Sequence, residues 1–343
     1  MNRIEKMTFI NLDNIQKGRN AFMGLAILWV ILFHYSESLS NTLISPVIEK
    51  GFLGVDIFLL LSSFGLCFSL KRDNNYVNFI KRRVKRIIPT WWIVYTFILV
   101  LNIVLQKDHP NDIFQIICYY SGAGWWLFNN PDLLGVYYWE WYIPTLLYFY
   151  LFAPFLFKLN TKKLSIIFIA SIIISIVLSY FHIAQTLFIS YSRIPVFIYG
   201  FLIYRMYSGE IDAKISRTYL CVSSIAGLIL FVFAMSFKFK YGLNLYCFMF
   251  ALPLLLNVCY ILLRGIPARV LSFIGTLTLQ LYLIHNIYGH PLGCIRSLIP
   301  NRIVAVCVTL ILLIVISYVF SIVVSYMIKK LESIATVKTG DEH

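Results

Sequence analysis

The chain has 343 residues, of which 60% are hydrophobic and only 13% are charged, and its formal net charge is +14. A soluble domain carries about 25% charged residues to cover its surface, so this composition excludes an ordinary soluble enzyme. The mean hydropathy of +0.79 is typical of a polytopic membrane protein. The positive charges form short clusters between apolar runs, without the basic stripe or motif of nucleic-acid binding, so we expect no nucleic-acid partner.

Cysteine spacing gives no sign of a metal site. The seven cysteines are scattered, mostly inside apolar runs, without a Cys-x-x-Cys or a Cys/His ligand spacing. We therefore expect neither a bound metal nor a disulfide framework. The polar start, residues 1–20, leads into a full-length apolar span, so no cleavable signal peptide is expected.

Ten apolar runs predict the architecture, because a membrane span needs about 20 mostly apolar residues. The runs lie near residues 21–36, 52–70, 88–105, 141–157, 164–181, 189–206, 219–236, 243–263, 271–288 and 303–328. We predict an all-α polytopic membrane protein, a bundle of about ten transmembrane helices. The loops are too short for a separate soluble domain, so residues 1–343 are expected to form a single integral membrane domain.

The charges between these runs predict the orientation, since Lys and Arg accumulate in cytoplasmic loops. With the N-terminus inside, the cytoplasmic segments are 1–20, 71–87, 158–163, 207–218, 264–270 and 329–343. Most of the 29 Lys and Arg residues fall in these segments, whereas the opposite segments hold six of them. Both termini are therefore expected in the cytoplasm, with residues 1–20 as the N-terminal segment and 329–343 as the tail.

The longest loop on the opposite side, residues 106–140, is rich in aromatic residues, including Trp125 and Trp126. Such residues commonly form a belt at the membrane–water interface. Their flat faces can also stack on a sugar ring. Both interpretations stay open, and we take Trp125, Trp126 and the following Trp141 and Tyr142 as candidates for substrate binding.

Five ionisable residues stand in or at the ends of predicted spans, where charge is costly and therefore points to function: His34, Asp56, Glu140, Arg193 and His285. A rise of about 1.5 Å per residue places all five in the outer half of the membrane, which predicts a shared polar cavity open to the outside. Thr278, Tyr282 and His285 recur at helical spacing and form one polar stripe. We add Tyr282 and Ser62 to the candidates for substrate binding. The alternative for His34 and His285 is a core histidine bonded to a neighbouring hydroxyl or carbonyl.

Several stretches now read together. They are MGLAILWVILFHY (23–35), GFLGVDIFLLLSSFGLCFSL (51–70), FIKRRVKRIIPTWW (79–92), WYIPTLLYFYLFAPFL (141–156), RIPVFIYGFLI (193–203) and GTLTLQLYLIHNIY (275–288). In this order they resemble the family-3 membrane acyltransferases, which O-acetylate bacterial surface glycans. The resemblance runs from about residue 15 to 328.

The resemblance implies a ten-helix enzyme in the bacterial cytoplasmic (inner) membrane. It would move an acyl group, in the first instance acetyl, from cytosolic acetyl-CoA to a hydroxyl of a surface polysaccharide or related glycan. Its partners would be membrane lipid and a glycan or lipid-linked glycan acceptor; the sequence identifies no protein partner. His34 matches the catalytic His of the family. Asp56 and Ser62 match its Asp and Ser, and Arg193 and His285 match two further motif residues.

Three positions depart from the family pattern. Ser63, which follows Ser62, stands where the family has Gly. The Arg that precedes the catalytic His by eleven positions falls on Met23, and Arg19, one turn earlier, is the candidate to replace it at the acyl-CoA site. The Glu that many members carry in the fourth helix falls on Leu146. Glu140 is a different residue, which we also take as a catalytic candidate.

The chemistry suits these residues. A His with a pKa near neutrality can take the proton of an attacking sugar hydroxyl, which contributes about 10²–10⁴ in rate. Arg193 or His285 could donate to the oxyanion. The basic run that contains Arg82, Arg83 and Arg86 could hold the phosphates of CoA, although topology alone also demands basic residues there. The thioester is already activated, so no metal is required, and no Ser stands in a nucleophile elbow.

Two other classes of protein remain as alternatives. A transporter or flippase for a lipid-linked sugar would also use intramembrane charges, but it favours repeats and paired broken helices that this sequence lacks. A sensor or structural membrane protein would carry out no chemistry. Binding and consumption of acetyl-CoA separate the enzyme from both.

Overall fold

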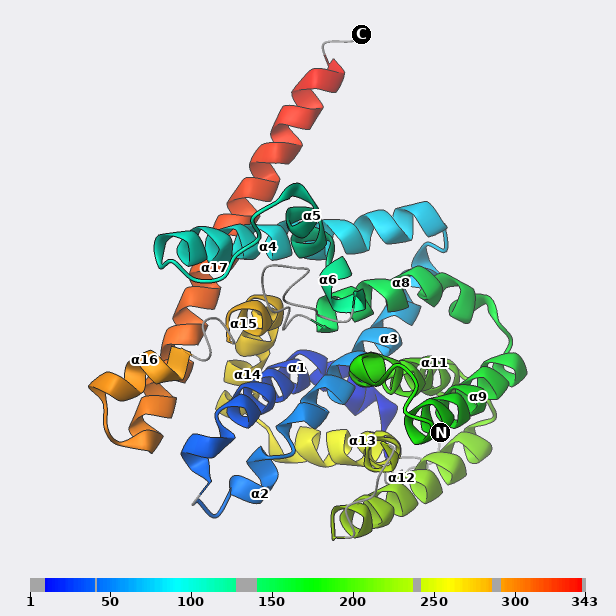
Figure 1. Ribbon diagram of the computed structural model, residues 1–343. Coiled ribbons are helices and arrows are strands. Elements are labelled where there is room, and N and C mark those ends of the chain that lie inside the picture. Colours follow the sequence, from blue (N-terminus) through cyan, green and yellow to red (C-terminus); the bar gives the residue numbers. More distant parts are fainter. Residues whose placement is uncertain (1–9, 41, 128–140, 237–241, 286–290, 341–343) are drawn as a thin grey trace.

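The computed structural model describes residues 10–40, 42–127, 141–236, 242–285 and 291–340, and these form helices joined by short connections (Figure 1). The long helices of the first half are α1 (Leu12–His34), α3 (Gly54–Arg72), α4 (Tyr76–Val104), α8 (Tyr142–Lys158) and α9 (Thr161–Tyr180). The second half contributes α11 (Ile194–Tyr207), α12 (Ala213–Ser236), α13 (Leu243–Leu262), α14 (Ile266–Thr276), α15 (Thr278–Ile284) and α17 (Arg302–Gly340). The predicted all-α class is confirmed for the described residues.

Short helices occupy several connections that the sequence analysis treats as loops or span ends. They are η2 (Ser36–Leu39), α2 (Ser45–Ile48), η3 (Gly51–Leu53), α5 (Ile113–Ser121), α6 (Ala123–Trp126), η4 (Gln185–Leu187), α10 (Phe188–Tyr191) and α16 (Pro291–Leu298). The sixth predicted span, residues 189–206, is therefore built from α10 and α11 in succession, and η4 directly precedes it. Helix α17 continues twelve residues beyond its predicted end at residue 328, and Figure 1 shows its C-terminal part projecting away from the other helices.

Side-chain caps fix where several helices begin. Asn11, Asn75 and Asn160 precede α1, α4 and α9, and each accepts a hydrogen bond from a backbone N–H in the first turn. Asp112 does the same for α5. These bonds satisfy amides that have no partner within the helix. Because of its cap, α4 starts at Tyr76 and includes the basic segment that the sequence analysis assigns to a loop.

Helix α1 lies at the centre of the bundle, where it packs against α3, α13 and α14. Its apolar face, including Ile27 and Ile31, is fully buried. The contact with α14 is close because Gly24 and Gly275 face the backbone of the opposite helix; a Cβ on either would collide with Leu271 or Asn20. This close approach brings the chain that follows α14 up to α1.

Seven described helices are long and apolar enough to cross a membrane, or eight if α14 and α15 form one bent span. Helix α1 is not among them, since Lys17, Arg19 and Asn20 lie within it, and α8 is short at 17 residues. The count of ten spans and the position of the termini stay predictions. The ninth predicted span is not one continuous helix: α14 and α15 meet at Leu277 at an angle of 65°.

Candidate active site

Two histidines from distant parts of the chain meet in the structure. His34 is the last residue of α1, and His285 follows α15 directly. Their rings lie with centroids 5.0 Å apart, inclined by 58°. His285 is buried, and His34 is half-buried. The polar stripe that predicts a role for His285 therefore ends beside the residue that matches the catalytic His of the family.

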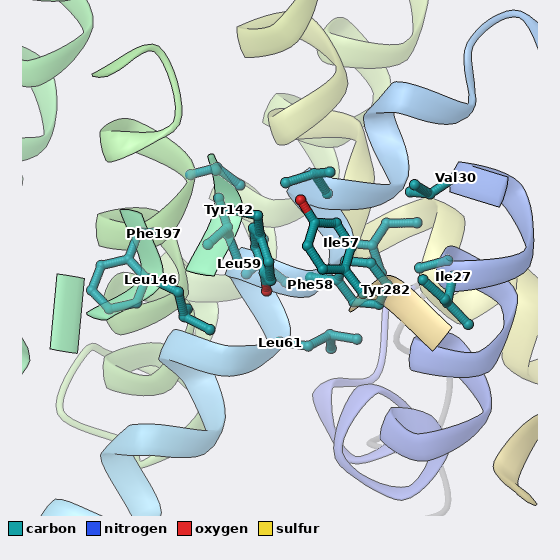
Figure 2. Packing of buried hydrophobic residues seen from close by; sticks show 14 of the residues in the cluster. Ile27, Val30, Ile57, Phe58, Leu59, Leu61, Tyr142, Leu146, Phe197 and Tyr282 are labelled. Carbon is teal, nitrogen blue, oxygen red and sulfur yellow. The ribbon is translucent and has the colours of Figure 1, made fainter. Parts of the chain in front are cut away.

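A line of aromatic rings continues from this pair. The ring of Tyr282 lies 5.5 Å from that of His285 and 5.0 Å from that of Tyr142, measured between centroids. Figure 2 shows Tyr142 and Tyr282 within the buried cluster that also contains Phe58 and Leu146. Two of the predicted substrate-binding residues are thus brought together next to the histidines.

These tyrosines line a cavity of about 400 Å³. Phe58, Ser62, Ser69 and Arg72 of α3 all line it, so it follows that helix for about 21 Å at 1.5 Å per residue. Phe58 lies near one end of this stretch, and Arg72 at the other. The cavity therefore joins an arginine-bearing end of the bundle to the tyrosines beside the histidine pair.

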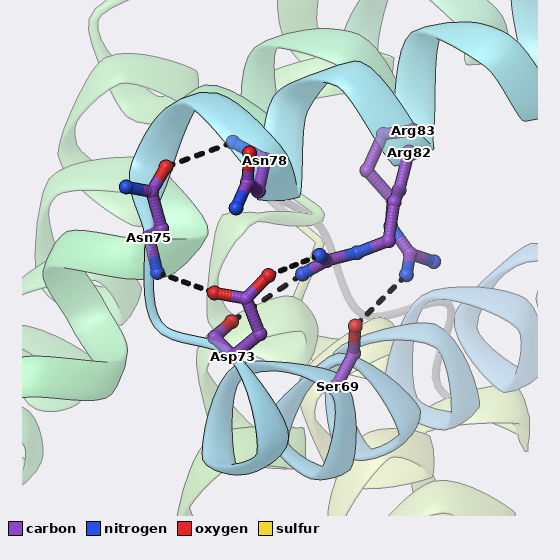
Figure 3. A network of polar contacts seen from close by, with 6 residues as sticks. All are labelled: Ser69, Asp73, Asn75, Asn78, Arg82 and Arg83. Carbon is purple, nitrogen blue, oxygen red and sulfur yellow. Dashed lines mark hydrogen bonds and ion pairs between the residues drawn. The ribbon is translucent and has the colours of Figure 1, made fainter.

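Four arginines line the cavity: Arg19, Arg72, Arg83 and Arg86. Arg19 donates from Nε to the carbonyl of Leu61 at 3.2 Å, and its guanidinium lies over Gly65, where a Cβ would approach it to 3.0 Å. Arg83 donates to the hydroxyl of Ser69 at 3.1 Å (Figure 3). Several guanidinium groups at one cavity are suited to bind phosphate groups.

The basic run of α4 divides into two parts. Arg83 and Arg86 line the cavity, whereas Arg82 donates to the carboxylate and the backbone carbonyl of Asp73, in the connection between α3 and α4 (Figure 3). The bonded Arg82 guanidinium holds the pKa of the Asp73 carboxyl below its ordinary value. The structure thus assigns Arg82 to the turn and leaves Arg19, Arg83 and Arg86 of the predicted acyl-CoA residues at the cavity.

A second pair consists of opposite charges. Arg193 Nε lies 3.4 Å from Asp56 Oδ1, and both side chains are buried. Arg193 also donates to Ser192 Oγ at 2.9 Å, and its guanidinium lies 5.9 Å from the ring centre of Trp141. The guanidinium therefore faces Trp141, which directly precedes Tyr142 at the cavity. Four of the five predicted ionisable residues thus form two pairs, His34 with His285 and Asp56 with Arg193. The fifth, Glu140, lies outside the described residues.

The predicted aromatic platform is dispersed among other contacts. Trp125 donates from Nε1 to Ser190 Oγ at 3.1 Å. Trp126 packs against Tyr148, with ring centroids 5.0 Å apart, and lines a separate apolar cavity between α4 and α8. Trp141 and Tyr142 are the candidates of this group that lie near the histidine pair.

The sequence analysis overlooked two residues of the site. Arg72 reads as ordinary cytoplasmic charge, although Ser62, Ser69 and Arg72 recur at spacings of seven and three residues, which could have indicated one face of α3. Tyr35 is adjacent to His34, and its hydroxyl donates to the carbonyl of His285 at 3.2 Å. No spacing in the sequence indicates that second contact.

Met23 and Leu146, two of the three departures from the family pattern, also line the cavity. These two side chains are thus positioned to change how this cavity holds its ligand. Arg19, on the same helix as Met23, supplies the guanidinium there.

Comparison with known proteins gives one match. No curated protein and no solved structure shows a significant match to the chain. The model of the family-3 acyltransferase domain matches residues 20–330, which is most of the chain and includes every residue of the two pairs and almost all of the cavity. This confirms the resemblance that the six motifs indicate. The chain is a membrane acyltransferase and belongs to the family-3 acyltransferases.

Proposed function

We propose that the protein transfers an acyl group, in the first instance acetyl, from acyl-CoA to a hydroxyl of a surface polysaccharide or related glycan. The observation that supports this most directly is the cavity that runs from Arg72, Arg83 and Arg86, past Arg19, to Tyr142 and Tyr282, beside the histidine pair. It combines an anion-binding end and a buried end next to a base, which is what a CoA thioester and its attacking alcohol require.

The donor suits the cavity by charge and by its elongated shape. CoA carries its phosphates at one end of a long flexible arm and the thioester at the other. Arg72, Arg83 and Arg86 would hold the phosphates, because one guanidinium can donate two parallel hydrogen bonds to a phosphate group. Arg19, which lies against Leu61 and Gly65, would bind the part of acyl-CoA that enters the cavity. The arm would follow α3 past Ser62 and bring the acyl carbon towards Tyr282.

In the reaction, His34 acts as general base. It takes the proton of the acceptor hydroxyl while that oxygen forms an ester bond to the acyl carbon. The carbon–sulfur bond of the thioester then breaks, and the proton passes from His34 to the departing thiolate, which leaves as CoA. Each proton and each bond is accounted for without a metal ion or a covalent acyl-enzyme.

The Asp56–Arg193 pair is assigned a positioning role. Arg193 faces Asp56, Ser192 and Trp141, and a guanidinium over an indole ring is attracted by the face of the ring. The pair would hold Trp141, and through the chain the adjacent Tyr142, at the wall of the cavity. We therefore favour this role over donation to the oxyanion.

In the cell, the arginine end would face the cytoplasm of a bacterium, where acyl-CoA is made, and the histidine pair would lie towards the outer face. This orientation follows the asymmetry of Lys and Arg in the sequence. In a variant whose seven native cysteines are replaced by serine, a cysteine placed at Asn75, in the turn after α3, should then react with a permeant but not with an impermeant thiol reagent in whole cells. Reaction with the impermeant reagent would show that the arginine end faces outwards instead.

The direct test uses the full protein in lipid nanodiscs with acetyl-CoA and oligosaccharides from the host envelope. We expect CoA thiol to be released only when an acceptor is present, together with an ester on the sugar that mild base removes. A protein that neither binds nor consumes acetyl-CoA with any acceptor would contradict the proposal, and that is the behaviour expected of a transporter or a sensor.

A further inference from the structure

Tyr35 joins the ends of two helices that carry the histidine pair. It is the residue that caps α1, its side chain is 1% exposed, and its hydroxyl donates to the backbone carbonyl of His285 at 3.2 Å. A phenol hydroxyl in an apolar interior needs an acceptor, and the last carbonyls of a helix lack partners within that helix. The bond satisfies both groups and fixes the C-terminal end of α15 against that of α1.

The ring of His285 is fixed by a second bond. Its Nδ1 lies 2.6 Å from the carbonyl oxygen of Tyr282. A carbonyl oxygen only accepts hydrogen bonds, so Nδ1 must carry the hydrogen. In the neutral imidazole, Nε2 is then the nitrogen that accepts a proton. The Tyr282 carbonyl thus selects one tautomer and one orientation of the ring.

The two bonds hold His285 from both sides, one at its backbone and one at its ring. His34 directly precedes Tyr35, and its ring lies 5.0 Å from that of His285. A shift of α15 relative to α1 would therefore break the Tyr35 bond and separate the rings. The Tyr35 hydroxyl is placed where it controls the distance between two proton-accepting groups.

We infer that Tyr35 is a positioning residue, whose hydroxyl sets the spacing of His34 and His285 for proton transfer from the glycan hydroxyl that attacks the thioester. This inference rests on the proposed function. Tyr35 itself touches neither substrate nor the transferred proton. Its contribution is the geometry of the pair, and a displacement of about 1 Å in a catalytic group can cost as much as 10²-fold in rate.

The test is Tyr35→Phe in the full protein in nanodiscs, which removes one oxygen and keeps the ring. A matched control is Tyr119→Phe, because the Tyr119 hydroxyl also donates from a buried ring to a backbone carbonyl, that of Tyr95, at 3.3 Å. Each variant loses the hydrogen bond to its backbone carbonyl, with a similar expected cost in stability of about 1 kcal/mol. Acetyl-CoA turnover is measured per folded protein, with the solvent deuterium isotope effect on kcat.

For Tyr35→Phe we expect kcat to fall by about tenfold, with KM for acetyl-CoA changed by less than about twofold, and the isotope effect to rise because proton transfer becomes slower. Tyr119→Phe should keep the kcat and isotope effect of the parent. In a His285→Ala background, Tyr35→Phe should have no further effect, since the group it positions is gone.

Two results would overturn the inference. In the first, Tyr35→Phe has the same kcat and isotope effect as Tyr119→Phe. In the second, the double variant Tyr35→Phe with His285→Ala loses kcat by the product of the two single losses. If Tyr35→Phe yields little folded protein, the comparison is made on the folded fraction isolated by size exclusion, where the isotope effect still decides. Failure of the proposed function is distinguishable, because the parent protein would then not consume acetyl-CoA at all.

Discussion

The rings of His34 and His285 lie with their centroids 5.0 Å apart. His34 is the last residue of α1 and His285 follows α15, so the two residues are about 250 positions apart in the chain. Their meeting depends on the packing of α1 against α14, where Gly24 and Gly275 let the two backbones approach closely. The bend of 65° at Leu277 then turns α15 away from α14. The site is thus produced by one close helix contact and one break.

Replacing His34 by Gln tests its role as general base. An amide can keep a hydrogen bond but cannot take a proton at neutral pH, so we expect acyl transfer to fall by about 10²-fold or more while the protein stays folded in the membrane. The control is His182→Gln, an exposed histidine in the connection after α9. Ester formation is measured at equal expression. Retention of more than about a tenth of the parent rate would exclude general-base catalysis by His34.

Much of this site can be predicted from the sequence, because ionisable residues in apolar runs are conspicuous. His34, Asp56, Arg193 and His285 are all indicated in this way, and each proves to have a neighbour within the same set. Which residue meets which is beyond the sequence, since the partners come from different helices. Periodicity gives the face of a helix but not the helix that covers it.

Other features have no signal in a single sequence. Tyr35 is one of 23 tyrosines, and its bond to the carbonyl of His285 depends on the tertiary contact alone. Arg72 and Arg82 look alike beside an apolar run, yet one lines the cavity and the other is bonded to Asp73. The break at Leu277 lies inside an apolar stretch, and its mean hydropathy over the length of a span predicts one continuous helix.

The division of the basic run is tested by comparing Arg83→Gln with Arg82→Gln. Arg83 lines the cavity, so its loss should raise KM for acetyl-CoA by about tenfold, which corresponds to about 1.4 kcal/mol for one charge-assisted contact. Arg82→Gln breaks the bond to Asp73 and should leave that KM within about twofold of the parent, because the group is used in the turn. Both are measured by initial rates against acetyl-CoA. An equal rise in KM for both variants would mean that the run acts as a diffuse positive charge.

The Asp56–Arg193 pair gives a different signature. Asp56→Asn leaves the buried Arg193 charge without its counter-ion, and breaking a buried pair in this way costs about 3–5 kcal/mol. The double variant Asp56→Asn with Arg193→Gln removes both charges and should recover at least half of that loss. Thermal unfolding in detergent measures the stability of each variant. Losses that simply add would show that the two side chains do not act as a pair.

The contact between α1 and α14 can be tested by adding one methyl group. A Cβ at Gly275 would collide with the backbone of Asn20, which cannot move aside as a flexible side chain could. We therefore expect Gly275→Ala to separate the helices at a cost of about 1–3 kcal/mol, the usual penalty for overpacking. Since α15 follows α14 directly, the same separation should move His285 away from His34 and lower kcat per folded molecule.

Gly293→Ala in α16 is the matched control, because a Cβ there meets no atom within 4 Å and alanine favours a helix. Melting temperature and acetyl-CoA turnover are measured for both variants, and a Gly275→Ala protein as stable and as active as Gly293→Ala would show that this close approach does not set the position of the histidine pair.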